Sequence, residues 1–160
     1  MKRLLILSML FLIFTGCSRT PINGLVPARG QVLYDGSPIG GVGIVFTPDA
    51  NSGSDRFANG VTKDDGTFEL ETAGYKGILP GTYIVTLSKT STKSKITEAE
   101  EKKLLAENKP IPNAEIIYHI PYKYNNPMLS EIKIEIDKNG KKDVKIELMP
   151  DNTPPPVSDI

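Results

Sequence analysis

Residues 30–46 read GQVLYDGSPIGGVGIVF, and they contain two short strands separated by a turn. The first strand is Gly30–Tyr34. The second, at residues 42–47, places apolar side chains at every other position, which is the period of a strand with one buried face. The DGSP turn at residues 35–38 separates them, because glycine supplies a positive φ and proline fixes its own φ. The stretch therefore predicts β-strands joined by tight turns.

The same signals continue to residue 149. Asp64-Asp65-Gly66 predicts a hairpin, because Asp-Gly readily adopts the left-handed backbone that hairpin turns need. Asn139-Gly140 predicts a second hairpin between the last two strands, which would have one packed face and one wet face. The predicted strands lie at residues 30–34, 42–47, 56–63, 67–72, 82–89, 132–136 and 144–148.

One segment has a helical pattern. Thr97-Glu98-Ala99-Glu100 has the form of a capping box, and good helix formers continue to Glu107. Leu104 and Leu105 give only a narrow apolar stripe, so we expect a short helix at about 97–107 that lies on the surface. Seven strands with one inserted helix predict an all-β fold, a seven-stranded antiparallel β-sandwich. The surrounding segment, residues 90–119, carries no motif that indicates its role.

The chain begins with a pattern typical of a secretory signal. Lys2 and Arg3 are followed by an apolar run and by small residues before Cys17, the only cysteine. The run has about 11 residues, fewer than the roughly 20 that a membrane-spanning helix needs. We expect residues 1–16 to be removed as a signal peptide. Cys17 could have a function of its own at the cleavage site, or the leader could be an ordinary secretion signal that a cysteine follows by chance.

Length and charge limit the range of functions. Removal of the leader leaves 144 residues, enough for one domain, with 17 basic and 19 acidic residues. A net charge close to zero gives no electrostatic reason to expect a nucleic-acid partner. The proline-rich residues 150–160 are expected to form a flexible tail.

The residues before Cys17 resemble the lipobox of bacterial lipoproteins, in which the cysteine thiol takes a diacylglycerol before the leader is cut. Phe14 stands where Leu, Val or Ile is usual, and Ser18 stands where aspartate would retain the protein in the inner membrane. The resemblance implies a lipid on Cys17, a lipidated tether at residues 17–28, and anchoring in the cell envelope, with the outer membrane favoured.

Three segments carry a second resemblance. Residues 30–46 have the pattern G-x-V-x-x-D-G-x-P-I-x-G-V-x-I-x-F, residues 62–70 have T-x-D-D-G-x-F-x-L, and residues 79–85 have L-P-G-x-Y-x-V. These patterns resemble carboxypeptidase-regulatory-like domains. Residues 120–127, I-P-x-K-Y-x-x-P, resemble small bacterial lipoproteins built on that domain. The resemblance implies a transthyretin-like β-sandwich over residues 29–149.

No set of residues indicates an enzyme. His119 is the sole histidine, so a zinc site or an iron site of several histidines cannot be assembled around it. Asp64 and Asp65 invite a calcium interpretation, but the turn explains them without a metal. Glu69 and Glu71 share a predicted strand face, as solvated strands often arrange their carboxylates. We therefore predict no catalytic residue, no metal and no cofactor.

Tyr118, Tyr122 and Tyr124 are the candidate ligand or partner surface. Three tyrosines within seven residues could form an exposed aromatic strip for sugar rings or for a partner's side chains. Alternatively, they pack over the open end of the sandwich. The sequence thus predicts a non-enzymatic, lipid-anchored envelope module for protein interaction or structural support. The alternative is a lipoprotein that binds carbohydrate or peptidoglycan, through the tyrosines or the loop at residues 49–55.

Overall fold

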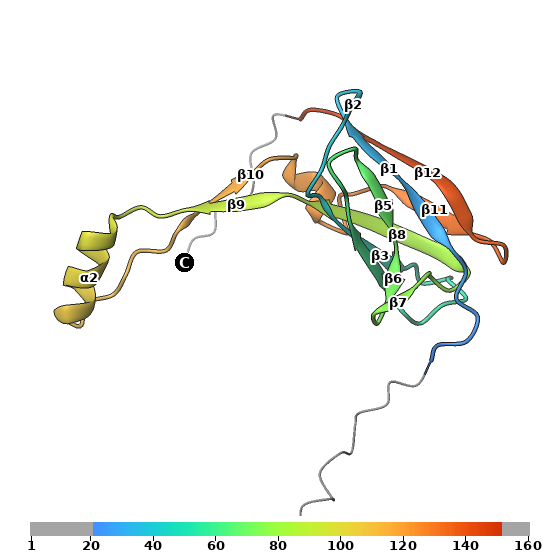
Figure 1. Ribbon diagram of the computed structural model, residues 1–160, viewed down its shortest axis with the longest axis horizontal. Helices are drawn as coiled ribbons and strands as arrows, with labels where there is room; N and C mark the ends of the chain where they lie inside the picture. Colours follow the sequence, from blue (N-terminus) through green and yellow to red (C-terminus); the bar gives the residue numbers. More distant parts are fainter. Residues whose placement is uncertain (1–20, 152–160) are drawn as a thin grey trace, which may run out of the picture.

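The structure is a computed structural model that describes residues 21–151 (Figure 1). The predicted leader, Cys17 and the tail from residue 152 onward lie outside the described residues. The helical segments are the α-helix α2 (Glu98–Ala106) and the short 3-10 helix η1 (Tyr122–Asn125). The strands are β1 (Ala28–Tyr34), β2 (Ser37–Pro38), β3 (Gly43–Pro48), β4 (Ala58–Val61), β5 (Thr67–Glu69), β6 (Glu71–Thr72), β7 (Tyr75–Lys76), β8 (Gly81–Ser88), β9 (Thr90–Lys93), β10 (Glu115–Tyr118), β11 (Lys133–Ile136) and β12 (Lys141–Leu148).

Most of the strands belong to two sheets that enclose one apolar core. In the first sheet, β1 lies between β12 on one side and β2 and β5 on the other. The second sheet has the order β11-β8-β3-β4-β6-β7. The all-β, sandwich-like architecture is therefore confirmed. The core side chains come from both sheets and from η1: Ala28, Val32, Val42, Ile44, Phe46, Ala58, Phe68, Leu70, Ile78, Tyr83, Val85, Leu87, Ile120, Tyr124, Ile134, Ile136, Val144, Ile146 and Leu148.

Strand alternation positions the core as the sequence predicts. In β8, Tyr83, Val85 and Leu87 are all buried, while the residues between them are partly exposed. β3 pairs with β8 in antiparallel register and buries Ile44 and Phe46 on the same face. The predicted turn after β1 is also present, with positive φ at Asp35 and Gly36, and it pairs β1 with β2.

The predicted hairpin at Asp64-Asp65-Gly66 is confirmed only as a turn. Gly66 has a φ of +76°, and the Lys63 N–H donates to the Thr67 carbonyl over 2.8 Å. Beyond the turn the predicted strand at 67–72 divides, because β5 pairs with β1 in one sheet and β6 pairs with β4 in the other. This segment therefore crosses between the sheets and closes one side of the core.

The predicted last hairpin, around Asn139-Gly140, is wrong. β11 pairs with β8, whereas β12 pairs with β1, so the turn connects the two sheets. Both strands bury one face, and each adds to the edge of a different sheet, which covers more core than a hairpin would. The Lys141 N–H donates to the Pro27 carbonyl over 2.9 Å and holds β12 beside β1.

The β1–β12 pair also corrects the antiparallel prediction, because these two strands run parallel. The pair is parallel because the chain crosses from the second sheet to the first at Asn139-Gly140. β12 starts at the end of the sandwich where β1 starts, so the two strands point the same way. The described residues contain twelve strand segments, several of only two residues, where seven were predicted.

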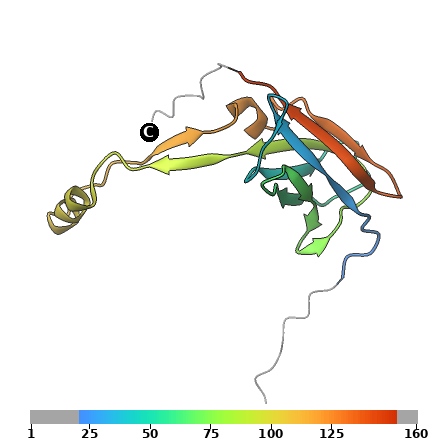
Figure 2. The same cartoon turned by 45° about the horizontal axis from the view of Figure 1, so that its top comes forward.

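The helix does not lie on the sandwich. β8 continues into β9, α2 follows, and β10 returns beside β9, so residues 90–118 form a projecting arm with α2 at its tip (Figures 1 and 2). The predicted capping box is present: Thr97 Oγ1 accepts from the Glu100 N–H, and the Glu100 carboxylate accepts from the Thr97 N–H. None of the α2 residues is buried. Among residues 21–151, no helix is long and apolar enough to cross a membrane.

Candidate functional site

The N-terminal segment and the arm are attached to different ends of the sandwich. At one end, β1, β8 and β12 begin, and Val26 forms a bridge with Ile78. At the other end, Tyr34 pairs with Leu148, and β8 leads into the arm. The N-terminal segment and the arm therefore leave the sandwich at opposite ends, as Figure 1 shows.

The arm exposes apolar side chains that have no core to enter. Every residue of β9 is exposed, and in β10 only Tyr118 is partly buried. Ile116 is 55% exposed, Ile117 is 38% exposed, and Leu105 on α2 is 60% exposed. An isolated two-stranded hairpin is at best marginally stable in water. The exposed isoleucines on such a hairpin make the arm the candidate functional site.

Contacts at the base fix the arm to the sandwich. The Lys89 ammonium donates to the Gly40 carbonyl over 2.8 Å, and the His119 N–H donates to the Lys89 carbonyl over 2.8 Å. His119 is exposed and directly follows β10, as expected of a strand-end residue. Its Nε2 lies 2.9 Å from the Ser91 hydroxyl. The arm therefore begins where Lys89 and His119 lie side by side.

The three predicted tyrosines do not form one exposed strip. Tyr118 and Tyr122 are partly buried and meet edge to face, with ring centroids 5.5 Å apart. Tyr124 is buried in the core instead, and its hydroxyl accepts a hydrogen bond from the Met149 N–H over 3.0 Å. Lys123 lies over the Tyr124 ring and pairs with Asp151 over 3.1 Å. Tyr124 therefore closes the sandwich, and two tyrosines remain near the surface.

The outward side chains of β3, β4 and β8 in the second sheet are uncharged, whereas β11 exposes Lys133 and Glu135 and β6 exposes Glu71. β3, β4 and β8 turn Val45, Thr47, Val61 and Thr86 outward, with Phe57 just before β4. Phe57 is 60% exposed and Val61 is 63% exposed. Val45, Val61 and the neighbouring Phe57 are therefore exposed apolar side chains among the polar ones that the outer face of an antiparallel sheet normally carries.

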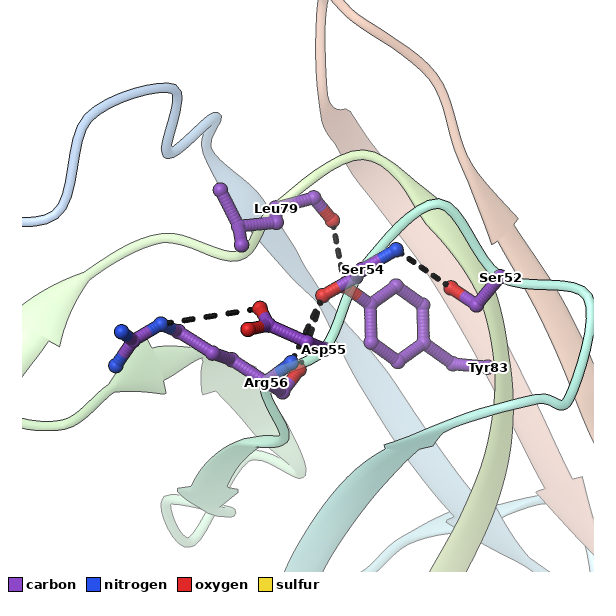
Figure 3. A network of polar contacts seen from close by, with 6 residues as sticks. All are labelled: Ser52, Ser54, Asp55, Arg56, Leu79 and Tyr83. Carbon is purple, nitrogen blue, oxygen red and sulfur yellow. Dashed lines mark hydrogen bonds and ion pairs between the residues drawn. The ribbon is translucent and has the colours of Figure 1, made fainter.

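The loop at residues 49–55 is closed over Tyr83 (Figure 3). Ser54 is buried, its N–H donates to the Ser52 hydroxyl, and its own hydroxyl accepts from the Arg56 N–H. The Tyr83 hydroxyl donates to the Leu79 carbonyl over 2.7 Å, and burial raises the pKa of Tyr83. The polar groups of this loop thus bond mainly to one another, and the loop covers one end of the core.

The other predicted polar residues serve turns and strands. The Asp65 carboxylate accepts from both the N–H and the hydroxyl of Thr67, and these hydrogen bonds lower the pKa of Asp65. Glu69 pairs with Lys76 over 3.1 Å, and Glu71 lies on a strand of the other sheet. In residues 21–151, no three His, Cys, Asp or Glu side chains gather as a metal site would require.

A shallow groove of about 610 Å³ lies on the outer face of the first sheet, where β12, β1 and β5 meet. Arg29 and Lys145 line it beside Glu69 and Asp143. Charges of both signs alternate there, as they do on the solvated face of an ordinary sheet.

Asp49, in the loop at residues 49–55, forms an ion pair with Lys133 on β11. The Lys133 ammonium donates to the Asp49 carboxylate over 3.1 Å, and the Ala50 N–H donates to it over 2.8 Å. The Lys133 hydrogen bond is the largest cause of a pKa of Asp49 below its usual value, and the Ala50 bond adds to it.

Replacement of Lys133 with alanine should therefore raise the pKa of Asp49 towards its usual value. A lowered pKa stabilises the fold above the pKa of the unfolded carboxylate, and this stabilisation is lost as the pH falls through the folded value. The stability difference between the two proteins should thus be largest near neutral pH and shrink in acid. An NMR titration of the Asp49 carboxyl carbon measures the pKa. Lys138→Ala, at an exposed turn position, is the control and should leave it unchanged.

Comparisons with family models, with curated proteins and with solved structures give no match to this chain. The candidate functional site is therefore assigned from the structure of the arm. Sequence analysis left residues 90–119 without a role and did not single out Ile116 and Ile117. Their signal was two adjacent isoleucines in a polar segment, between Pro112 and Pro121.

Proposed function

We propose that the protein is a non-enzymatic, lipid-anchored module of the cell envelope, whose β-sandwich presents the arm to a partner protein. The observation that carries this proposal is the position of the arm, at the end of the sandwich opposite the N-terminal segment. A lipid on Cys17 would hold one end of the sandwich towards the membrane. The arm would extend from the other end of the sandwich, where a partner can reach it.

The reach of the tether supports this arrangement. Among the described residues, Val26 is the first that pairs with the sandwich, through its bridge to Ile78. Val26 lies nine positions after Cys17 in the sequence, so the chain between them spans at most about 32 Å. The sandwich would therefore stay close to the bilayer. We infer a transthyretin-like relationship for the sandwich from the motifs at residues 30–46 and 62–70, and the role of the arm does not depend on it.

The test is crosslinking in cells with the full-length, tagged protein, followed by mass spectrometry. In one variant, Asn-Gly replaces residues 90–118. This two-residue turn fits, because Lys89 and His119 are already joined by a backbone hydrogen bond. The arm contributes none of the core side chains, so thermal unfolding of the sandwich should change little. We expect the intact protein to crosslink to one reproducible envelope protein and the variant to lose that product.

Two further results keep the test decisive. Cys17→Ala should release the protein from the membrane fraction or leave an uncleaved precursor, and an unchanged mass and fractionation would contradict the anchor. If the variant without the arm folds and still gives the same crosslinks, the arm is not the interaction site.

The alternative function, glycan binding, would use Tyr118 and Tyr122, whose rings remain partly exposed. Tyr122→Ala should then reduce binding to isolated peptidoglycan, whereas crosslinking through the arm should persist. Tyr124 is unsuitable for this test, because its replacement would also disturb the core.

A further inference from the structure

The arm has two strand edges, and they differ in character. In the described part of the chain, β9 and β10 pair only with each other. A free edge presents unpaired N–H and C=O groups that can template another strand, and edge lysines discourage such pairing. β9 ends on Lys93, and Lys95 follows it. β10 reads EIIY and contains no lysine, so its edge is the one open to pairing.

Hydrogen bonding between β9 and β10 shows which groups of β10 are free. Ile117 lies opposite Ser91, and the register continues to His119, whose N–H donates to the Lys89 carbonyl. Hydrogen-bonded positions alternate along an antiparallel pair. Ile117 therefore directs its backbone groups towards β9. Ile116 and Tyr118 direct theirs to the free edge.

We propose that the partner of this edge is a second copy of the chain, whose β10 adds antiparallel to form a four-stranded sheet. This inference rests on the proposed function, because it names the partner of the arm. A two-fold axis through Ile117 would place the free backbone groups of Ile116 opposite those of Tyr118 from the second copy. These positions can exchange backbone hydrogen bonds in both directions.

The side chains in this register are complementary. Ile117 of each copy meets Ile117 of the other, and Ile116 meets Tyr118, a β-branched and aromatic pair of the kind that stabilises sheets. Glu115 meets His119, so a carboxylate lies opposite an imidazole. Lys93 lies opposite Glu115 on its other side, within the same copy. Three of the four strands would thus carry the row Lys93, Glu115 and His119 of the second copy. The pairing also gives each of the two exposed isoleucines an apolar neighbour across the edge.

Disulfide crosslinking in the membrane-anchored, full-length protein tests this register. Cys17 is the only cysteine of the unsubstituted sequence, so each variant adds one new thiol. Directly opposed residues at a position without hydrogen bonds across the pair have α-carbons about 4.5 Å apart, within the range of about 4.4–6.8 Å that a disulfide needs. Ile117→Cys should therefore give a disulfide-linked dimer under mild oxidation. Thr92→Cys, on the other strand, and Leu105→Cys, on the more exposed helix tip, are the controls and should stay monomeric.

A charge exchange supplies the second measurement. Glu115→Lys in the Ile117→Cys background should lower the yield of dimer about tenfold, because two symmetric pairs lose their attraction. Adding His119→Glu should recover part of the yield, because the new lysine then meets a carboxylate of the second copy, while it still faces Lys93 in its own copy. This recovery separates a loss of pairing from a damaged fold.

The outcomes separate this inference from the proposed function. A dimer at Ile117 that responds to the charge exchange supports self-pairing. Equal crosslinking at Leu105, no dimer at Ile117, or a disulfide from Ile117→Cys to a different protein overturns it. If the dimer fails but arm-dependent crosslinks to another envelope protein remain, the proposed function stands without self-pairing. If both fail, the arm is not an interaction site.

Discussion

Replacement of Phe46 with alanine should lower the free energy of unfolding by about 3–5 kcal/mol, the usual cost of removing a buried aromatic side chain. Phe46 is fully buried on β3. Its ring centroid lies 6.5 Å from that of Phe68 in the other sheet and 6.0 Å from that of Tyr83 on β8. The truncation would leave a cavity between the two sheets. The free energy of unfolding of a whole domain is about 5–15 kcal/mol, so the variant should be close to unfolding.

Phe57 provides a matched control for this change. It carries the same side chain just before β4 of the same sheet but is 60% exposed. Phe57→Ala should change the stability by no more than about 0.5 kcal/mol, because its ring already lies largely in water. Urea unfolding followed by circular dichroism measures both variants, and the slope of the transition should stay the same. Similar losses in the two variants would mean that the core does not lie between these sheets.

Replacement of Gly30 with alanine should lower the free energy of unfolding by about 3 kcal/mol, the upper range for overpacking. A β-carbon on Gly30 would overlap the Val144 carbonyl oxygen and lie 2.7 Å from the Val144 β-carbon. Both groups belong to β12, which pairs with β1 at this position. Because backbone atoms meet the new methyl group, the strands must separate to admit it. Strand propensity alone predicts the opposite sign, since alanine is favoured over glycine in a strand.

Gly43 supplies the control, because it also lies in a strand. A β-carbon there would be 3.4 Å from the Ser88 hydroxyl oxygen and 3.6 Å from the Ser88 carbonyl oxygen, close to ordinary contact distances. Gly43→Ala should therefore be neutral or stabilise by about 0.5 kcal/mol. Thermal unfolding of the two variants measures this difference in stability. If Gly30→Ala is as stable as Gly43→Ala, β1 and β12 do not approach as closely as the parallel pairing requires.

Much of the sandwich could be predicted from local patterns. The alternation in β3 and β8 predicted which residues are buried, because a strand turns successive side chains to opposite faces. The turn at residues 35–38 was predicted because glycine supplies a positive φ and proline fixes its own, and the structure adds a positive φ at Asp35. The capping box of α2 was predicted because its hydrogen bonds lie within four residues.

The candidate site was only partly predictable. Tyr118, Tyr122 and Tyr124 were grouped by spacing, but the 3-10 helix that follows β10 turns Tyr124 into the core and leaves Tyr122 beside Tyr118. Ile116 and Ile117 gave no recognisable motif, because their exposure depends on the arm leaving the sandwich. The lipid anchor on Cys17 remains a prediction from the leader.

By itself the sequence determined the strands with one buried face, the tight turns and the helix cap, because each depends on side chains within a few residues. Only the tertiary structure decided how those pieces pair. Asn139-Gly140 joins two sheets instead of closing a hairpin, since β11 pairs with β8 and β12 pairs with β1. The segment at 67–72 divides between sheets, and residues 90–118 leave the sandwich altogether. These choices depend on strands that are distant in sequence competing for the same core, which no local pattern encodes.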